Sequence, residues 1–453
     1  MKKRSPKKIT PTKPLTSITN PDAAGIDIGS TKILVCVPAD RDPEFVRTFD
    51  TFTVDLLKIR DWLKMCRITS VAMEATGVYW VPLYEVLDSS GFEVILVNPR
   101  QLKRDKKTDV LDCQLIQQWH SYGLLNSSFR PADQICVLRT IIRHRANLTV
   151  LRTKHIQHMQ KAMHQMNLQL DNVVSDITGE TGLAIIRNIV EGNHDPLHLA
   201  KLRNPRCKST EEQIAKSLQG NYRLEHLFTL KQSLRLFDTF SQSIAECDTQ
   251  LEMLYKEMAA TVPEQRIMPQ TFKKANRNRN SPQYDLQNYL FQIYGVDLTQ
   301  IPSISSLTAQ VLFSEIGPDL SRFPSEKHFT RWLRVSPDNR TSGNKLLPQS
   351  PFKVKNKAAL ALRVAAASLA DSKSALGDFY RKNRARFGPL KANAICAHKL
   401  ARIIYFLLKT KTQFDTTLLE RLNEKQRDKA IKNLVAKAKR HGFTLIPLST
   451  SVS

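Results

Sequence analysis

An apolar stripe at steps of three and four residues runs through the middle of the chain and constrains the fold more than any other feature. Its members are Leu227, Leu230, Leu234, Phe237, Phe240, Ile244, Cys247, Leu251, Leu254 and Met258. The spacing is heptad-like with one three-residue irregularity, which is typical of a long helix that packs along its length on another helix. A long helical region over residues 131–261 is therefore expected.

An earlier run has similar spacing and supplies a second apolar stripe: Leu148, Leu151, Met159, Met163 and Met166. Two such stripes predict either a helical hairpin within one chain or a coiled coil that joins two protomers. The second alternative is favoured here. It predicts a homo-oligomer, a dimer or tetramer, held together through the helical region.

The charge of the chain indicates its partner. The 453 residues include 68 Lys and Arg against 42 Asp and Glu, a formal net charge of +26. Basic residues recur in the segments 138–155 and 379–391, so the excess is not confined to a tail. A positive excess of this size predicts a polyanionic partner, with nucleic acid as the first expectation.

Cysteine usage and hydropathy bear on the compartment. The seven cysteines are scattered singly without a C-x-x-C pair, which argues against a zinc ribbon or a disulfide framework and favours reducing cytosol. The first residues lack the apolar core of a signal peptide, and no apolar run reaches the ~20 residues of a membrane span. The expected protein is soluble and cytoplasmic, with no membrane partner.

The first part of the chain alternates strand and helix patterns. A flexible basic leader, residues 1–22, precedes strand patterns at 23–38, 46–52, 70–75 and 93–99. Helix patterns cover 54–66 and 108–123, the latter capped by Thr108. Strands mixed with helices in this order predict an α/β domain over residues 23–130.

The rest of the chain is expected to be mainly helical. Residues 262–288 are rich in Pro, Asn and basic residues without an apolar period and are interpreted as a linker. A mostly helical domain is predicted over 289–411. A basic tail with one amphipathic helix follows over 412–453.

Four acidic residues have the pattern of a metal site. Asp27 lies in a strand pattern, and Glu74 follows a buried strand, where a charge needs a partner such as a cation. Asp109 and Asp112 are three apart on a predicted helix, which places both on one face. Any one of these acids alone is better explained as a helix cap or a surface charge.

Taken together, the four carboxylates form the arrangement that holds two divalent metal ions for phosphoryl transfer. Mg²⁺ is the expected cofactor, with two ions, because every candidate ligand is a hard oxygen and no His or Cys joins the set.

Several segments resemble a known family. They are "GIDIGSTK" (25–32), "MEATGVYW" (73–80), and the stretches 97–125, 140–148, 160–182, 335–369 and 394–409. These segments are similar to the transposases of insertion-sequence family 110, which are related to the Piv DNA invertases. The resemblance implies an N-terminal RuvC-like domain with an RNase H fold, and a C-terminal transposase domain.

The resemblance also implies residue roles. It places the family's DEDD set at Asp27, Glu74, Asp109 and Asp112, and its nucleophilic serine at Ser342 in "TSGNK". Attack by a serine preserves the energy of the phosphodiester in a phosphoserine link, so that the strand can be rejoined without ATP. The implied partners are donor and target DNA and a structured noncoding bridge RNA.

Basic residues near these motifs are candidates for nucleic-acid contacts. They are Arg100, Lys103, Arg104, Lys106 and Lys107, just before the acidic helix, and Lys345 beside Ser342. A solvated charged loop is the alternative explanation for the first five. Ser303, Ser305 and Asn344 stand where the family usually has glycine.

Four other functions compete with the recombinase. A RuvC-type junction nuclease would hydrolyse DNA with water and tolerate the loss of Ser342. A site-specific DNA invertase is a second alternative. A noncatalytic descendant of a transposase would bind nucleic acid alone. "GIDIGSTK" is also typical of sugar kinases, but the chain lacks their second glycine-rich phosphate loop.

Overall fold

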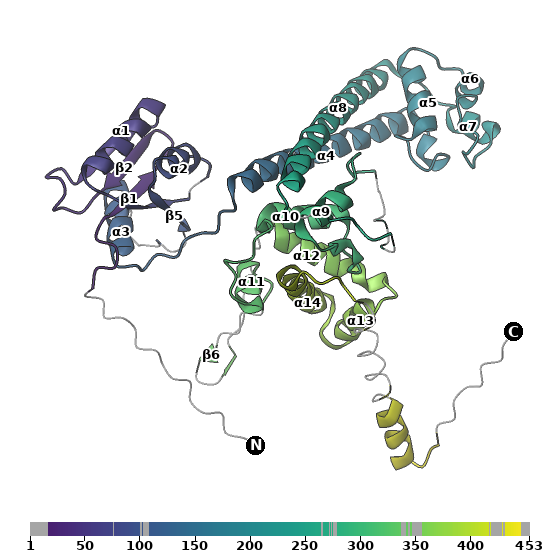
Figure 1. Cartoon of the computed structure of the whole chain (residues 1–453). Helices are drawn as coiled ribbons and strands as arrows, with labels where there is room; N and C mark the ends of the chain where they lie inside the picture. The colour runs from purple at the N-terminus through teal and green to yellow at the C-terminus, as the bar shows by residue number, and fades with distance from the viewer. Residues whose placement is uncertain are drawn as a thin grey trace. The chain divides into compact units, whose positions relative to one another are not determined.

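The computed structural model describes most of the chain (Figure 1). The described residues are 17–75, 77–99, 102, 108–263, 266–270, 272, 274, 279–336, 341–342, 345–346, 356–415, 417, 428 and 431–444. They form two compact units, Met1–Arg130 and Pro131–Ser453, which are described separately below.

The first unit contains a five-stranded mixed sheet in the order β3-β2-β1-β4-β5. The strands are β1 (Ala23–Ile28), β2 (Lys32–Cys36), β3 (Val46–Asp50), β4 (Ser70–Glu74) and β5 (Glu93–Val97). The β1–β2 and β2–β3 pairs are antiparallel, whereas β4 lies parallel to both β1 and β5. The predicted α/β character of this region is confirmed.

Helices cover the two faces of the sheet. On one face, α1 (Thr53–Met65) and α2 (Trp80–Ser89) contribute Leu63 and Leu83 to a core with Ile26 and Met73 of the sheet. On the other face lies α3 (Asp109–Ser121), where Ile116 packs with Ala72 and Val97, and Cys113 with Leu34 and Cys36. The alternation along β1 and β4 thus assigns successive residues to opposite layers.

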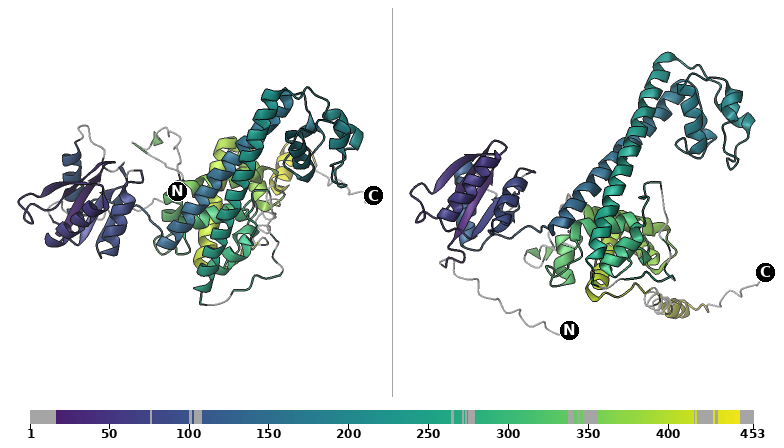
Figure 2. Two further views of the ribbon diagram at one scale, coloured as in Figure 1. Left: turned by 90° about the horizontal axis from the view of Figure 1, so that it is seen from above. Right: turned by 45° about the horizontal axis from the view of Figure 1, so that its top comes forward.

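The second unit begins with a long helical hairpin, formed by α4 (Asp133–Gln165) and α8 (Leu224–Ala260) (Figure 2). Leu148 of α4 packs with Ile244 and Cys247 of α8, and Ile141 and Phe240 extend the contact. The apolar stripe therefore packs on a helix of the same chain, which is the hairpin alternative. Assembly into a homo-oligomer through this region stays a prediction.

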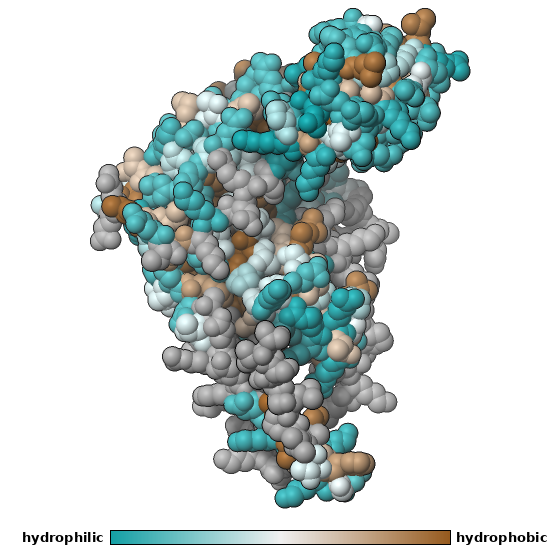
Figure 3. All heavy atoms as spheres, turned by 90° about the vertical axis from the view of Figure 1, so that its right-hand side faces the viewer, coloured by the Kyte–Doolittle hydropathy of each residue, from teal (hydrophilic) through white to brown (hydrophobic). Residues whose placement is uncertain are grey.

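A small helical subdomain lies between α4 and α8 in sequence. It comprises η2 (Leu170–Asn172), α5 (Glu180–Val190), α6 (Pro196–Ala200) and α7 (Glu211–Ser217). Met163, Leu170, Ile186, Ile214 and Leu230 belong to its core, which joins it to the ends of both long helices. Figure 3 shows this end of the hairpin at the top, with a surface that is mainly hydrophilic.

The remainder of the second unit is a helical body, as predicted. Its elements are α9 (Leu286–Tyr294), η3 (Leu298–Gln300), α10 (Ser306–Ile316), α11 (Glu326–Trp332), β6 (Thr341–Ser342), β7 (Lys345–Leu346), α12 (Lys357–Ser368), η4 (Leu369–Asp371), α13 (Ala375–Phe387) and α14 (Pro389–Thr410). Leu362, Ala397 and Leu400 are fully buried in this body. Residues 431–440 of the tail are helical, within the range expected for the tail helix.

All seven cysteines are free thiols. In the described part of the chain, no helix combines the length and the apolar character that a membrane crossing requires.

Candidate active site

The sheet places Asp27 and Glu74 on neighbouring strands. β1 and β4 are parallel, and their paired residues include Gly25 with Ala72 and Ile26 with Met73. Asp27 and Glu74 are the next residues on each strand. Because Ile26 and Met73 point into the core beneath α1 and α2, alternation turns both carboxylates toward the opposite face, where α3 lies.

Helix α3 brings two more carboxylates to this face. Thr108 caps the helix, since its Oγ1 accepts a hydrogen bond from Leu111 N at 3.4 Å. Farther along, Gln117 Nε2 donates to Ala23 O at 3.3 Å, so α3 runs back along β1. The first turn of α3, with Asp109 and Asp112, therefore lies toward the end of β1 that carries Asp27. The predicted Thr108 cap is confirmed.

The electrostatics of Asp27 show that all four acids lie near one another. Burial, followed in order of effect by the charges of Glu74, Asp109 and Asp112, raises the pKa of Asp27 to about 6. A hydrogen bond from the backbone of Ile28 lowers the pKa of Asp27, but by less than burial and the three charges raise it. The structure thus brings together the four acids that the sequence pattern selected.

The donor set fits a divalent cation. Asp112 Oδ1 is buried and has no hydrogen-bond partner among the described residues, and Asp109 is exposed to solvent. Carboxylate oxygens are hard ligands that suit Mg²⁺ better than softer metals. No group of three or more His, Cys, Asp and Glu side chains in the described ranges already has the geometry of a metal site. Binding would therefore require the carboxylates to draw together.

Ser342 and Lys345 lie in the second unit, on a two-stranded antiparallel ribbon. Ser342 of β6 is paired with Lys345 of β7, so their backbones lie opposite each other across a two-residue connection. Their side chains and Asn344 lie outside what the structure describes.

The five basic residues expected to contact nucleic acid before α3, namely Arg100, Lys103, Arg104, Lys106 and Lys107, lie outside the described residues. Leu102, within the same segment, is described and buried, and it packs with Ala72, Val97 and Ile116. The basic composition around Leu102 gave no indication that this residue is buried.

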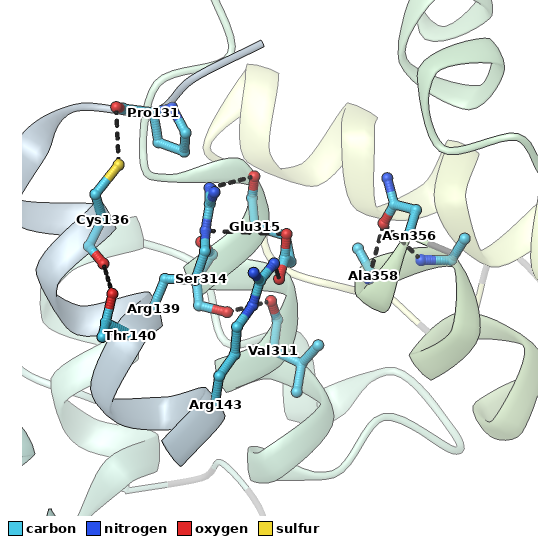
Figure 4. Close-up of polar contacts among 11 residues, drawn as sticks. Pro131, Cys136, Arg139, Thr140, Arg143, Val311, Ser314, Glu315, Asn356 and Ala358 are labelled. Atoms are coloured by element: carbon cyan, nitrogen blue, oxygen red, sulfur yellow. Dashed lines mark hydrogen bonds and ion pairs between the residues drawn. The ribbon is translucent and has the colours of Figure 1, made fainter. Parts of the chain in front are cut away.

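Arginines of α4 in the basic segment 138–155 make internal contacts (Figure 4). Arg139 Nε donates to Ser314 O at 2.7 Å at the end of α10, and Arg143 Nη2 bonds Glu315 Oε1 at 2.6 Å. Arg145 forms a buried ion pair with Asp248 of α8. These arginines therefore fasten α4 to its neighbours, a role that charge alone did not distinguish from nucleic-acid binding.

Gly25 is a residue of the site that sequence reasoning missed. A Cβ atom there would lie 2.2 Å from Gln117 N and 2.5 Å from Cys113 O, so only glycine allows α3 to lie this close to β1. A glycine inside a strand pattern is a known sign of close backbone approach and would have indicated this contact.

Comparisons with known proteins agree with this geometry. A family model of DEDD transposases of IS110 matches residues 24–168, and a model described as "Transposase IS116/IS110/IS902 family" matches residues 297–381. A search of curated proteins found no match. Both family models describe transposases, the class of enzyme that transfers DNA strands. The chain belongs to the IS110 family of insertion-sequence transposases.

Proposed function

We propose that this transposase is a metal-dependent DNA recombinase that cleaves and rejoins strands through a phosphoserine at Ser342, guided by a bridge RNA. The observation that carries the proposal is the grouping of Asp27, Glu74, Asp109 and Asp112, in which burial and the charges of the other three acids raise the pKa of Asp27 to about 6. Repulsion among four carboxylates destabilises the cluster unless cations neutralise it. A structural role alone does not account for such a cluster.

The sheet order supports an RNase H-like, RuvC-like assignment for the first unit. Three antiparallel strands, β1 to β3, are followed by two parallel strands, β4 and β5, in the order β3-β2-β1-β4-β5. Asp27 at the central strand, Glu74 on its parallel neighbour and a helix with two acids across one face suit an acidic site of this fold class. Fold likeness by itself leaves the chemistry open, so the proposal relies on the carboxylates.

Asp27, Glu74, Asp109 and Asp112 would hold two Mg²⁺ ions. When bound, such ions neutralise charge on a phosphodiester undergoing in-line displacement. Asp112 Oδ1, which has no hydrogen-bond partner in the part of the chain that the structure describes, is the carboxylate oxygen whose burial is best explained by a cation. Asp27, whose pKa burial raises to about 6 together with the neighbouring charges, would be stabilised in its charged form by such neutralisation.

Ser342 would supply the nucleophile. Its Oγ forms a bond to phosphorus while the bond from phosphorus to the leaving sugar oxygen breaks, so one ester replaces another and the energy is retained for rejoining. Lys345, opposite Ser342 on the ribbon, is proposed to contact the DNA backbone.

Nucleic-acid partners follow from charge and family. The net charge of +26 suits binding to donor and target DNA and to a bridge RNA, in which base pairing selects the sequence while the protein contacts the backbone. Arg100, Lys103, Arg104, Lys106 and Lys107, which precede α3 in sequence, are proposed as contacts to the nucleic-acid backbone. A dimer or tetramer and a cytoplasmic location also belong to the proposal.

A covalent-adduct assay tests the proposal. Full-length protein is incubated with labelled donor and target DNA, the noncoding RNA that flanks its gene, and Mg²⁺, and is then run on denaturing gels. We expect an adduct with wild type that is lost in Ser342→Ala and Asp27→Asn. Ser368→Ala on α12 and Asp61→Asn on α1, both at exposed positions, are the controls that retain it.

Cleavage without an adduct that survives Ser342→Ala would replace the recombinase with the hydrolytic nuclease.

Thermal melting adds an independent test of the cation site. Mg²⁺ at ten times its Kd should stabilise the wild type by about 1.4 kcal/mol and leave Asp112→Asn nearly unaffected. Equal stabilisation of both proteins would contradict the assignment of Asp112 as a ligand.

A further inference from the structure

Exposed apolar side chains flank the carboxylates at two places in the chain. In the turn after Glu74, Val78 and Tyr79 are 72% and 50% exposed. In the first turn of α3, between the two aspartates, Val110 and Leu111 are 45% and 43% exposed. Exposed apolar side chains next to carboxylates in the chain indicate a ligand that has both charged and apolar parts.

The ring of Tyr79 has a defined position in this turn. Gly77 adopts a φ of +57°, and a Cβ atom there would lie 3.6 Å from Cδ2 and Cε2 of Tyr79, so the ring lies beside the backbone of the turn. The next residue, Trp80, instead packs edge-to-face on Tyr84 at 5.7 Å and contributes to the core. Tyr79 Oη makes no hydrogen bond within the described part of the chain.

The turn lies within reach of the carboxylates. Gly77 is three residues after Glu74, so their Cα atoms are at most about 11 Å apart. Successive phosphates along a nucleic-acid strand are separated by a few ångströms of rise, about 3.4 Å in a duplex strand. The ring therefore lies within a few nucleotides of a phosphate held at the carboxylates.

We propose that Tyr79, supported by Val78, Val110 and Leu111, is a platform for an unstacked base of the DNA strand that is cleaved. The inference rests on the proposed function and identifies the form of its substrate. A base inside a duplex has both faces covered by its neighbours, whereas an exposed tyrosine ring binds a base whose face is free. The strand is therefore distorted or unpaired next to the cleavage site.

Tyr79 acts in this arrangement as a positioning residue. Stacking fixes the base, and through its sugar it fixes the phosphate that faces Asp27 and Glu74. The occupant is the cleaved DNA, because the carboxylates next to the platform act on that strand. Val110 and Leu111 would contact the sugar and base edges, which also present apolar surface.

Site-specific photocross-linking tests the proposal. Full-length protein is bound, in Ca²⁺ and with its flanking noncoding RNA, to target DNA that carries 5-iodouracil at successive positions around the cleavage site. We expect cross-links to Tyr79 at about one or two positions, identified by mass spectrometry of the peptide. Tyr79→Phe should keep a cross-link, whereas Tyr79→Leu should lose it and weaken DNA binding about 10-fold.

Phe52→Leu is the matched control. Phe52 is the other strongly exposed aromatic residue described in the first unit, at 72%, and lies beside the edge strand β3 rather than the carboxylates. The Phe52→Leu variant should change neither the cross-link to Tyr79 nor the affinity for DNA. A melting temperature of Tyr79→Leu equal to that of the wild type shows that the variant is folded.

The outcomes separate this inference from the proposed function. If the wild type cleaves DNA in an Asp27-dependent reaction but Tyr79→Leu behaves like Phe52→Leu, the platform is wrong and the recombinase stands. A cross-link from 5-iodouracil in the RNA, and none from the DNA, also overturns the platform. A wild type that neither binds nor cleaves DNA overturns both proposals.

Discussion

Gly25 of β1 lies directly against the backbone of Gln117 of α3, with 2.2 Å between Gln117 N and the place where a Cβ atom would stand. This contact sets the distance between the helix that carries Asp109 and Asp112 and the strand that carries Asp27. A side chain at position 25 would push α3 away and separate the acids.

We therefore expect Gly25→Ala to lower the free energy of unfolding of the first unit by about 1–3 kcal/mol through overpacking. It should also weaken Mg²⁺ binding, because Asp112 moves with α3. Thermal melting with and without Mg²⁺ measures both effects. Thr48→Ala, at an exposed position of the same sheet, is the control, and equal behaviour of the two variants would contradict the close contact.

The pKa of Asp27 predicts how stability depends on pH without metal. The folded value of about 6 lies above the ordinary value of 3.8, so the folded state binds more protons between these values. Stability should therefore fall as pH rises from about 4 to 6 and stay low above that range. Asp27→Asn removes the buried charge and should stabilise the protein at pH 7.5 in EDTA by about 1–2 kcal/mol, after allowance for solvent screening.

Melting temperatures measured across this pH range check the prediction for Asp27. The stabilising effect of Asp27→Asn should shrink toward pH 4, where the Asp27 carboxyl of the folded wild type is protonated and no longer carries a buried charge. Asp61→Asn, at an exposed position of α1, should show no such trend. A wild-type stability that rises between pH 4 and 6 in step with Asp27→Asn would refute the raised pKa.

Ser303 and Ser305 should respond to substitution in opposite directions. Ser303 has a φ of +79° and a buried Oγ without a hydrogen-bond partner among the described residues. Ser303→Gly relieves the left-handed backbone and should stabilise the second unit by up to about 1 kcal/mol. Denaturant unfolding measures the change.

Ser305 instead caps α10, since its Oγ accepts from Thr308 N at 3.1 Å. Ser305→Ala should cost about 1 kcal/mol by removing the cap. A destabilising Ser303→Gly together with a neutral Ser305→Ala would show that the backbone of the turn before α10 differs from the one described.

The Arg145–Asp248 pair is expected to hold the helical hairpin together. Arg145 Nε and Nη2 bond the two carboxylate oxygens at 2.5 and 3.0 Å, and both side chains are less than a tenth exposed. Arg145→Ala leaves Asp248 buried without its cation and should cost about 3–5 kcal/mol. Urea unfolding of the full chain, followed at the second-unit transition, measures this cost.

The exposed pair Arg187–Asp238, with a 3.0 Å contact and side chains about half exposed, provides the comparison. Arg187→Ala should change stability by no more than about 1 kcal/mol because water screens the pair. Similar effects of both arginine substitutions would show that burial does not strengthen the first pair.

Local sequence determined the secondary structure because its signals act over a few residues. The period of two in "GIDI" and "SVAME", the Thr108 cap and the three-to-four stripe on α8 each depend on neighbours in the chain, and the structure contains the strands and helices they predict. The pairing of Asp109 with Asp112 on one helix face followed for the same reason.

Strand order and helix partners were decided by tertiary structure. Asp27 and Glu74 lie on neighbouring strands only because β4 pairs with β1 in parallel, a contact between segments far apart in sequence that no local period specifies. The stripe on α8 could pack on a second protomer or on the same chain, and the sequence did not distinguish these alternatives because both bury the same apolar surface. In the structure, Leu148 of α4 packs on the stripe within the chain. Gly25 likewise owes its role to a helix more than eighty residues away, whose backbone leaves no room for a Cβ atom.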